Sequence, residues 1–410
     1  MPSRTENPPR ESGLDIVAFS RLFDNTTTSY KFLWMLGILK ITEESEELRI
    51  PTRRIVTHML ELARQPISVF HLFFGKDDRM HKCLEIMRRA ELETSAQALK
   101  NIPGHDKQQK ALSTVCTRLT KFVPQQILTP FFENEVKKYR KSGVRAAAIR
   151  RLSNKRFDDN ENPPPYRMGL SPSPNEIELH PKWRDYFMRN REIIRGWTMY
   201  HWIDFLQVRN PYVPSIVNKI IRPETREQQT QERRWWRAII HHTGGMRCIY
   251  SGKIINATDS FDLDHFIPWS FIGHNRLWNL IPATKNANLR KSDSLPNMEK
   301  YYDRFINTQY RALKANATLK RNNKIVNAYI EDLKITLPTA RKNLHTAYNT
   351  VIPPLITLAK NQGFAGDWDF DNAPAEDSRE AFKKAYKRRP AKVPQIPELQ
   401  FRLRIGFRTW

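Results

Sequence analysis

The chain has 410 residues, and its 68 Lys and Arg outnumber its 43 Asp and Glu to give a formal net charge of +25. This excess favours a polyanionic partner such as nucleic acid, although a merely solvated basic surface would carry the same charge. A hydrophobic share of 40%, with 21 Phe and 10 Trp, excludes global disorder.

The cysteines and the apolar runs bear on the cellular compartment. Cys83, Cys116 and Cys248 lie too far apart in the sequence for a disulfide framework, and residues 1–14 are polar rather than leader-like. The most apolar run, at 30–39, is much shorter than the roughly 20 residues that a membrane span needs. We therefore expect a reducing, cytoplasmic setting and no membrane partner.

The N-terminal part of the sequence is dominated by helical patterns. Residues 1–11 are expected to be disordered, and residues 12–156 to form an N-terminal helical domain. Hydroxyl groups at 26–28 precede a run that is apolar nearly all round, which predicts a buried helix. Further helical patterns lie at 54–63, 80–90, 108–121 and 131–141.

Proline then interrupts the helical pattern. Acidic residues, Asn and Pro fill 158–165, and Ser-Pro pairs follow at 171–174. These residues predict a linker or long loop at 157–180. The remaining segments are expected to be a helical approach segment, a C-terminal helical region and a basic Pro-containing tail, at 181–244, 298–382 and 383–410.

Residues 245–297 differ from their flanks because Gly, aromatic and β-branched residues appear there with turn signals. Alternating apolar and acidic residues at 261–264 predict a short strand that ends at His265. A loop, a second strand and a short helix are expected to follow, at 266–277, 278–282 and 284–291. The predicted fold class is mainly α with a small α+β module of ββα type.

Asp264, His265 and Asn288 of this module supply the groups that phosphodiester cleavage needs. A neutral imidazole, with a reference pKa of about 6.5, can take a proton from water. Carboxylate and amide oxygens suit Mg²⁺ or Mn²⁺, and such an ion offsets the charge of the phosphate. Because neighbouring strand residues point to opposite faces, the strand must end or bulge near Asp264 if Asp264 and His265 are to face one site.

The string at 264–296 resembles an HNH, or ββα-metal, endonuclease. Its Asp-His-x-x-Pro-x-Ser opening at 264–270 and its Asn-x-x-Lys-Ser-Asp-x-x-Pro closing at 288–296 are similar to the HNH domain of the RNA-guided type II CRISPR effectors. The resemblance implies that His265 is the general base and that Asp264 and Asn288 bind one divalent ion. It also implies that Asn279 steadies the loop and the His265 ring.

The sequence departs from many HNH proteins in its cysteines. Those proteins hold a structural zinc through two Cys-x-x-Cys pairs, whereas here Ser251 stands where the partner of Cys248 would be and no later cysteine follows. We therefore expect no structural zinc, and packing of aromatic residues must hold the hairpin.

The segment from 210 onward looks like the flanks of bacterial HNH proteins suspected of a role in phage defence.

Together these features predict a metal-dependent HNH endonuclease that cuts DNA, with duplex DNA as the expected substrate and defence against foreign DNA as the expected setting. Lys285, Arg290 and Lys291 are candidate phosphate contacts, although any exposed helix carries such charges. Two alternatives stay open. One is a DNA-binding protein without turnover, and the other is an RNA-cleaving or toxin nuclease.

Overall fold

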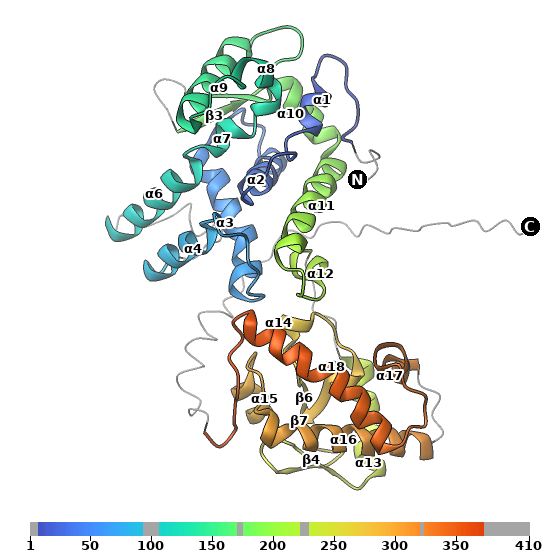
Figure 1. The fold of residues 1–410 in the computed structure, drawn as a ribbon. Coiled ribbons are helices and arrows are strands. Elements are labelled where there is room, and N and C mark those ends of the chain that lie inside the picture. The colour runs from blue at the N-terminus through green and yellow to red at the C-terminus, as the bar shows by residue number, and fades with distance from the viewer. Residues whose placement is uncertain (1–6, 93–105, 170–174, 222–228, 320–323, 373–410) are drawn as a thin grey trace, which may run out of the picture.

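The computed structural model describes residues 7–92, 106–169, 175–221, 229–319 and 324–372 (Figure 1). These residues form two lobes with separate hydrophobic cores, one built from residues between 14 and 216 and the other from residues between 235 and 368. Helices dominate both lobes and the strands are short, which confirms the predicted fold class. Disorder was expected for residues 1–11, of which 1–6 lie outside the described residues, as does the tail expected at 383–410. Within 7–11, the Pro9 carbonyl accepts a 2.7 Å hydrogen bond from the Tyr186 hydroxyl and Glu11 pairs with Arg189 at 3.2 Å.

The first lobe packs helices around one long apolar helix and carries a small sheet. Its elements are α1 (Ile16–Ser20), α2 (Tyr30–Glu44), β1 (Arg49–Pro51), α3 (Thr52–Ser68), α4 (Met80–Arg89), α6 (Asp106–Thr120), α7 (Val123–Gln126), η1 (Thr129–Phe132), α8 (Glu133–Val136), α9 (Ser142–Arg156), β2 (Tyr166–Met168), β3 (Glu176–Leu179), α10 (Pro181–Arg189), α11 (Arg191–Arg209) and α12 (Ile216–Ile220).

Helix α2 forms the centre of the first core, as its apolar sequence predicts. Its ten buried residues include Trp34 and Leu33, neither of which is exposed. Helix α3 approaches α2 closely at Gly37, where an added Cβ would lie only 2.9 Å from the Cγ2 atom of Ile55. A larger residue at position 37 would therefore force the two helices apart.

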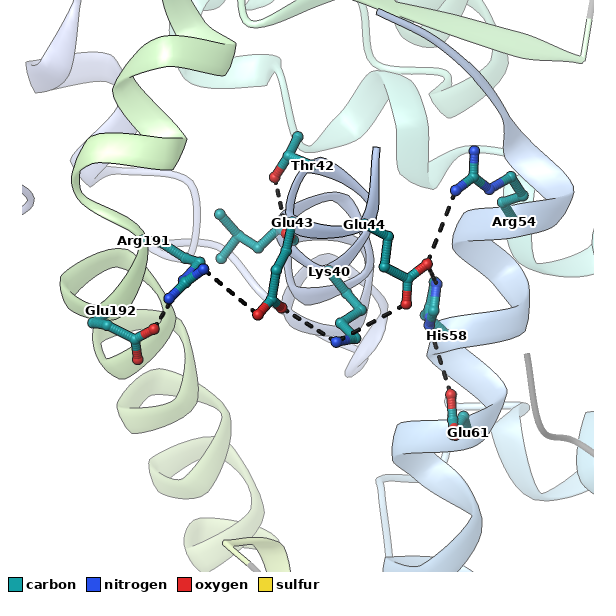
Figure 2. A network of polar contacts seen from close by, with 10 residues as sticks. Lys40, Thr42, Glu43, Glu44, Arg54, His58, Glu61, Arg191 and Glu192 are labelled. Atoms are coloured by element: carbon teal, nitrogen blue, oxygen red, sulfur yellow. Dashed lines mark hydrogen bonds and ion pairs between the residues drawn. The ribbon is translucent and has the colours of Figure 1, made fainter. Parts of the chain in front are cut away.

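Charged side chains connect the C-terminal end of α2 to two neighbouring helices (Figure 2). Glu44 lies 3.7 Å from the Nε2 atom of His58 and 3.9 Å from Arg54, both on α3. Glu43 pairs with Arg191 of α11 at 3.5 Å. The Glu43–Arg191 pair is partly exposed, and exposed pairs contribute on the order of 0–1 kcal/mol each. His58, in contrast, is buried.

The segment at 157–180 differs from the expected linker or long loop. β3 is the central strand of an antiparallel sheet and pairs with β1 and β2, and Ile177 and Leu179 are fully buried. Alternation of Glu and apolar residues at 176–179 is the strand signal, which the surrounding prolines obscured. The expected approach segment at 181–244 is also divided, since α10–α12 belong to the first core and the helix at 230–242 belongs to the second.

The second lobe places two β-hairpins among helices. Its elements are α13 (Thr230–His242), β4 (Met246–Arg247), β5 (Ile254–Ile255), β6 (Asp262–His265), α14 (Trp269–Ile272), η2 (Leu277–Asn279), β7 (Leu280–Ala283), α15 (Lys285–Lys291), α16 (Met298–Thr318), η3 (Lys324–Val326), α17 (Asn327–Leu333) and α18 (Arg341–Asn361).

The β6–β7 hairpin is antiparallel and is covered by α16 and α18. Asp264 lies opposite Ile281 in the ladder. The ring of Phe266 stacks on Phe305 of α16 with centroids 4.1 Å apart, and the Tyr348 hydroxyl of α18 donates a 2.8 Å hydrogen bond to the Trp278 carbonyl. Two long helices therefore hold the hairpin in place.

The lobes meet where α12 and the segment after α3 contact α14 and the end of α18. The ammonium of Lys219, which is only 1% exposed, donates to the carbonyls of Pro214 and Phe271 and so joins α12 to α14. Burial lowers the pKa of Lys219 to about 7. The Gln362 amide after α18 donates a 2.9 Å hydrogen bond to the Phe70 carbonyl. These contacts tie the hairpin module to the first lobe.

Among the described residues, every helix is either too short or too polar to cross a lipid bilayer.

Candidate functional site

The β6–β7 hairpin and α15 bring two aspartates of β6 into contact with Asn288 and Lys291 of the helix. Thr284 caps α15, since its hydroxyl accepts a hydrogen bond from the Ala287 amide, and the short helix then packs back against β6. The strands and the helix fall within two residues of the predicted ββα unit. Strand alternation places Asp262 and Asp264 on the face that α15 covers, and both contact this helix.

Asn288 of α15 contacts Asp262 on β6. Its amide nitrogen donates a 3.0 Å hydrogen bond to a carboxylate oxygen of Asp262. Both side chains are half-buried, so solvent reaches the pair. A carboxylate and an amide thus lie together at the open end of the interface between the strand and the helix.

Asp264 has different partners and is only 2% exposed. Lys291, one helical turn after Asn288, places its ammonium 3.1 Å from one carboxylate oxygen of Asp264 and 3.2 Å from the other. The Tyr250 hydroxyl donates a 2.6 Å hydrogen bond to the same carboxylate. Burial raises the pKa of Asp264, while Lys291 and Tyr250 oppose this rise by stabilising the charged form. Burial also raises the pKa of Tyr250, which keeps its hydroxyl protonated as a donor.

His265 ends β6 and is 5% exposed. Its Nε2 atom lies 2.9 Å from the amide oxygen of Asn275. Because that oxygen can only accept, Nε2 carries the hydrogen and the lone pair of the neutral ring belongs to Nδ1. β6 pairs regularly with β7 through Asp264 and His265, so strand alternation points the His265 ring and the Asp264 carboxylate to opposite faces of the strand. The link between these residues is Lys291, whose ammonium also donates a 2.7 Å hydrogen bond to the His265 carbonyl.

Asn279 steadies the loop that follows His265. Its amide oxygen accepts from the Ile267 amide at 2.9 Å, and its amide nitrogen donates to the Ile267 carbonyl at 2.8 Å. The side chain is fully buried. A contact to the His265 ring comes from Asn275, so the two roles that the resemblance gave to Asn279 are divided between two asparagines.

The three candidate phosphate contacts lie in different environments. Lys285 is exposed at the start of α15, whereas the guanidinium of Arg290 stacks over the ring of Phe370 with 4.4 Å to the centroid. Lys291 has no exposed surface and is engaged with Asp264 and the His265 carbonyl. A buried ammonium with two such partners does not reach a phosphate, so we do not retain Lys291 as a DNA contact.

Sequence reasoning missed two residues of this arrangement. One is Asp262, which strand alternation places on the same face of the predicted strand as Asp264. Asn275 carried no signal beyond its tendency to form turns, because its contact with His265 depends on the path of the whole loop at 266–277.

The donor chemistry around Asn288 fits a hard divalent cation. Asp262 and Asn288 lie side by side, joined by the hydrogen bond from the Asn288 amide nitrogen to the Asp262 carboxylate. The carboxylate of the one and the amide oxygen of the other are ligands that suit Mg²⁺ or Mn²⁺. In the part of the chain that the structure describes, no group of three or more His, Cys, Asp or Glu side chains is arranged to hold a metal ion. The candidate donors are therefore this mixed carboxylate and amide set, with the Asp264 carboxylate on the same strand face.

Comparison with known proteins identifies the same segment. Residues 248–297 match the family model described as HNH endonuclease. The matched segment begins at Cys248 and includes β6, β7 and α15. No curated protein and no solved structure matches the chain. The match supports assignment of this segment to the HNH nucleases, and it leaves the two flanking regions unassigned.

The buried pair between Lys291 and Asp264 gives a test of how the module is held together. Lys291→Met leaves the Asp264 carboxylate buried without its cation, so we expect the free energy of unfolding of the second lobe to fall by about 3–5 kcal/mol. Lys285→Met, a matched change at the exposed end of α15, should alter it by less than about 0.5 kcal/mol. Urea unfolding followed by tryptophan fluorescence measures both. The double variant Asp264→Asn with Lys291→Met should be more stable than Lys291→Met, because it no longer buries an unpaired charge. Equal stability of Lys291→Met and Lys285→Met would contradict the expectation.

Proposed function

We propose that the module at 248–297 is a metal-dependent endonuclease that hydrolyses the phosphodiester bonds of double-stranded DNA. One observation carries the proposal: the segment that matches the HNH endonucleases coincides with the hairpin and helix that hold His265, Asn288 and the two aspartates of β6. The net charge of +25 supports a nucleic acid substrate, since basic residues release counterions from a phosphate backbone.

Asn288 and Asp262 are the ligands that we propose for the cation, because their polar atoms already lie together and solvent reaches them. Asp264, the ligand expected from the sequence, adds a second negative charge on the same face of β6. Its carboxylate can bind the ion directly only by giving up part of its contact with Lys291. A bound Mg²⁺ or Mn²⁺ would offset negative charge on the phosphate and on the leaving oxygen.

His265 is the proposed general base. With its hydrogen on Nε2 held by Asn275, the ring can accept a proton from water at Nδ1. The water oxygen then forms a bond to phosphorus as the bond between phosphorus and the leaving sugar oxygen breaks, and that oxygen takes a proton from solvent. Asn275 thus acts as a positioning residue that fixes the protonated nitrogen of the ring.

We further propose that the protein acts in the cytoplasm in defence against foreign DNA. This setting is supported only by the resemblance of the segment from 210 onward to the flanks of bacterial HNH proteins suspected in that role.

Cleavage of plasmid DNA tests the proposed function. With Mg²⁺ or Mn²⁺ the wild-type protein should nick or cut the plasmid, and a chelator should stop it. His265→Ala should lower the rate by roughly 100-fold or more, since general-base catalysis contributes on that scale, while DNA binding in chelator stays near wild type. His345→Ala, at a partly exposed histidine of α18, is the matched control and should cut normally.

The other outcomes favour the alternatives. Cleavage of RNA without cleavage of duplex DNA would indicate an RNA nuclease. Binding of DNA without any cleavage would indicate a binding protein. Undiminished cutting by His265→Ala would refute the assigned role of this residue.

The role of Asn275 gives a second prediction. Asn275→Ala removes the acceptor that orients the His265 ring, so we expect the cleavage rate at saturating DNA to fall roughly 10- to 100-fold with little change in DNA affinity. Asn275→Asp keeps an acceptor oxygen and should retain most of the activity. Single-turnover cleavage assays measure both rates. An alanine variant as fast as wild type, or an aspartate variant as slow as alanine, would show that the contact does not orient the base.

A further inference from the structure

A basic hollow lies on the first turns of α13, outside the segment that matches the nuclease family. It has a volume of about 500 Å³ and is lined by Gln229, Thr230, Arg233, Arg234 and Arg237. Three of the five lining residues are arginines, and Arg237 lies one turn after both Arg233 and Arg234. The hollow therefore concentrates positive charge at the start of a helix, where the backbone amides also favour an anion.

Two of these arginines are held in place by the nuclease module. Arg233 donates to the Phe261 carbonyl, and Arg237 donates to the Ala257 carbonyl at 2.8 Å. Their guanidinium carbons also lie 5.8 and 5.4 Å from the centre of the Phe261 ring. Anchored guanidinium groups lose less conformational entropy on binding, and their planar fork matches the oxygens of a phosphate.

The described neighbours of this surface do not neutralise its charge. Among the described residues, Arg233, Arg234 and Arg237 form no ion pair with a carboxylate, although Glu232 lies on the same helix. Arg234 is exposed. The three arginines can therefore bind phosphate groups without first losing a salt bridge to a described carboxylate.

The buried face of α13 argues against insertion of this helix into a membrane. Trp235, Trp236, Ile239 and Ile240 fill the second core, so the helix has no apolar face left to insert into a membrane. A basic face above a buried apolar face suits a phosphate backbone, which needs charge and no apolar contact.

The hollow also contacts a residue that is adjacent in sequence to the candidate site. Phe261, which both anchored arginines contact, directly precedes Asp262 at the start of β6. We propose that Arg233, Arg234 and Arg237 form a phosphate-binding surface that holds the backbone of duplex DNA beside the candidate site. This inference rests on the proposed function, because it assigns the DNA strand a path from α13 to the Asp262 end of β6.

Equilibrium binding of a short labelled DNA duplex in chelator tests the surface without any cutting. Arg234→Ala removes one phosphate contact and leaves the anchoring hydrogen bonds intact. It should weaken binding roughly fivefold and reduce the slope of log affinity against log salt by about 0.9. Arg233→Lys keeps the charge but loses the fork and should weaken binding less. Arg195→Ala, at an exposed arginine of α11 in the first lobe, is the matched control and should bind as wild type does.

Each outcome decides the inference. Wild-type affinity and salt slope in Arg234→Ala would overturn it, as would an equal loss in Arg195→Ala, which would indicate a general effect of charge. The assignment to DNA would be wrong if Arg234→Ala weakens binding of an RNA duplex but leaves binding of the DNA duplex unchanged. If Arg234→Ala loses DNA binding while the wild-type protein cuts nothing, the surface stands and the nuclease proposal fails. If the wild-type protein cuts and Arg234→Ala binds normally, only the surface proposal fails.

Discussion

The buried ion pair between Lys291 and Asp264 is the contact on which the candidate site depends. Helix α15 has only seven residues and could not hold its position by helix propensity alone. Lys291 fixes its C-terminal end to β6, and the hydrogen bond from Asn288 to Asp262 fixes it one turn earlier. Because a buried charge without a partner costs several kcal/mol, the helix cannot leave the strand without a large loss of stability.

This constraint separates two aspartates that look alike in the sequence. Asp264 is enclosed by Lys291 and Tyr250 and serves mainly to position α15, whereas Asp262 shares a solvent-accessible position with Asn288. The same strand ends in His265, whose carbonyl is bonded to Lys291 and whose ring is bonded to Asn275. One lysine therefore fixes the relative positions of the candidate ligands and the candidate base.

Local sequence predicted the hairpin module better than its surroundings. Alternation at 261–264, turn residues in the loop and a threonine cap at the start of the helix are short-range signals, and the elements lie within two residues of the prediction. Strand β3 was not predicted because prolines surround its alternating residues and because one of its two partners, β1, lies more than a hundred residues earlier in the chain. Likewise, a lysine near the end of a helix is usually exposed to solvent. Nothing in the sequence predicted that Lys291 would be buried against Asp264. Asn275 could not be predicted because loop conformation, not residue pattern, brings it to His265.

The account depends most directly on a divalent ion bound by Asn288. Calorimetric titration of Mn²⁺ into the wild-type protein without DNA should give one binding site. Asn288→Ala should weaken that site by at least about tenfold, while Asn286→Ala, at an exposed position two residues earlier on α15, should leave it unchanged. Binding of Mn²⁺ to Asn288→Ala with the affinity of the wild-type protein would contradict the account.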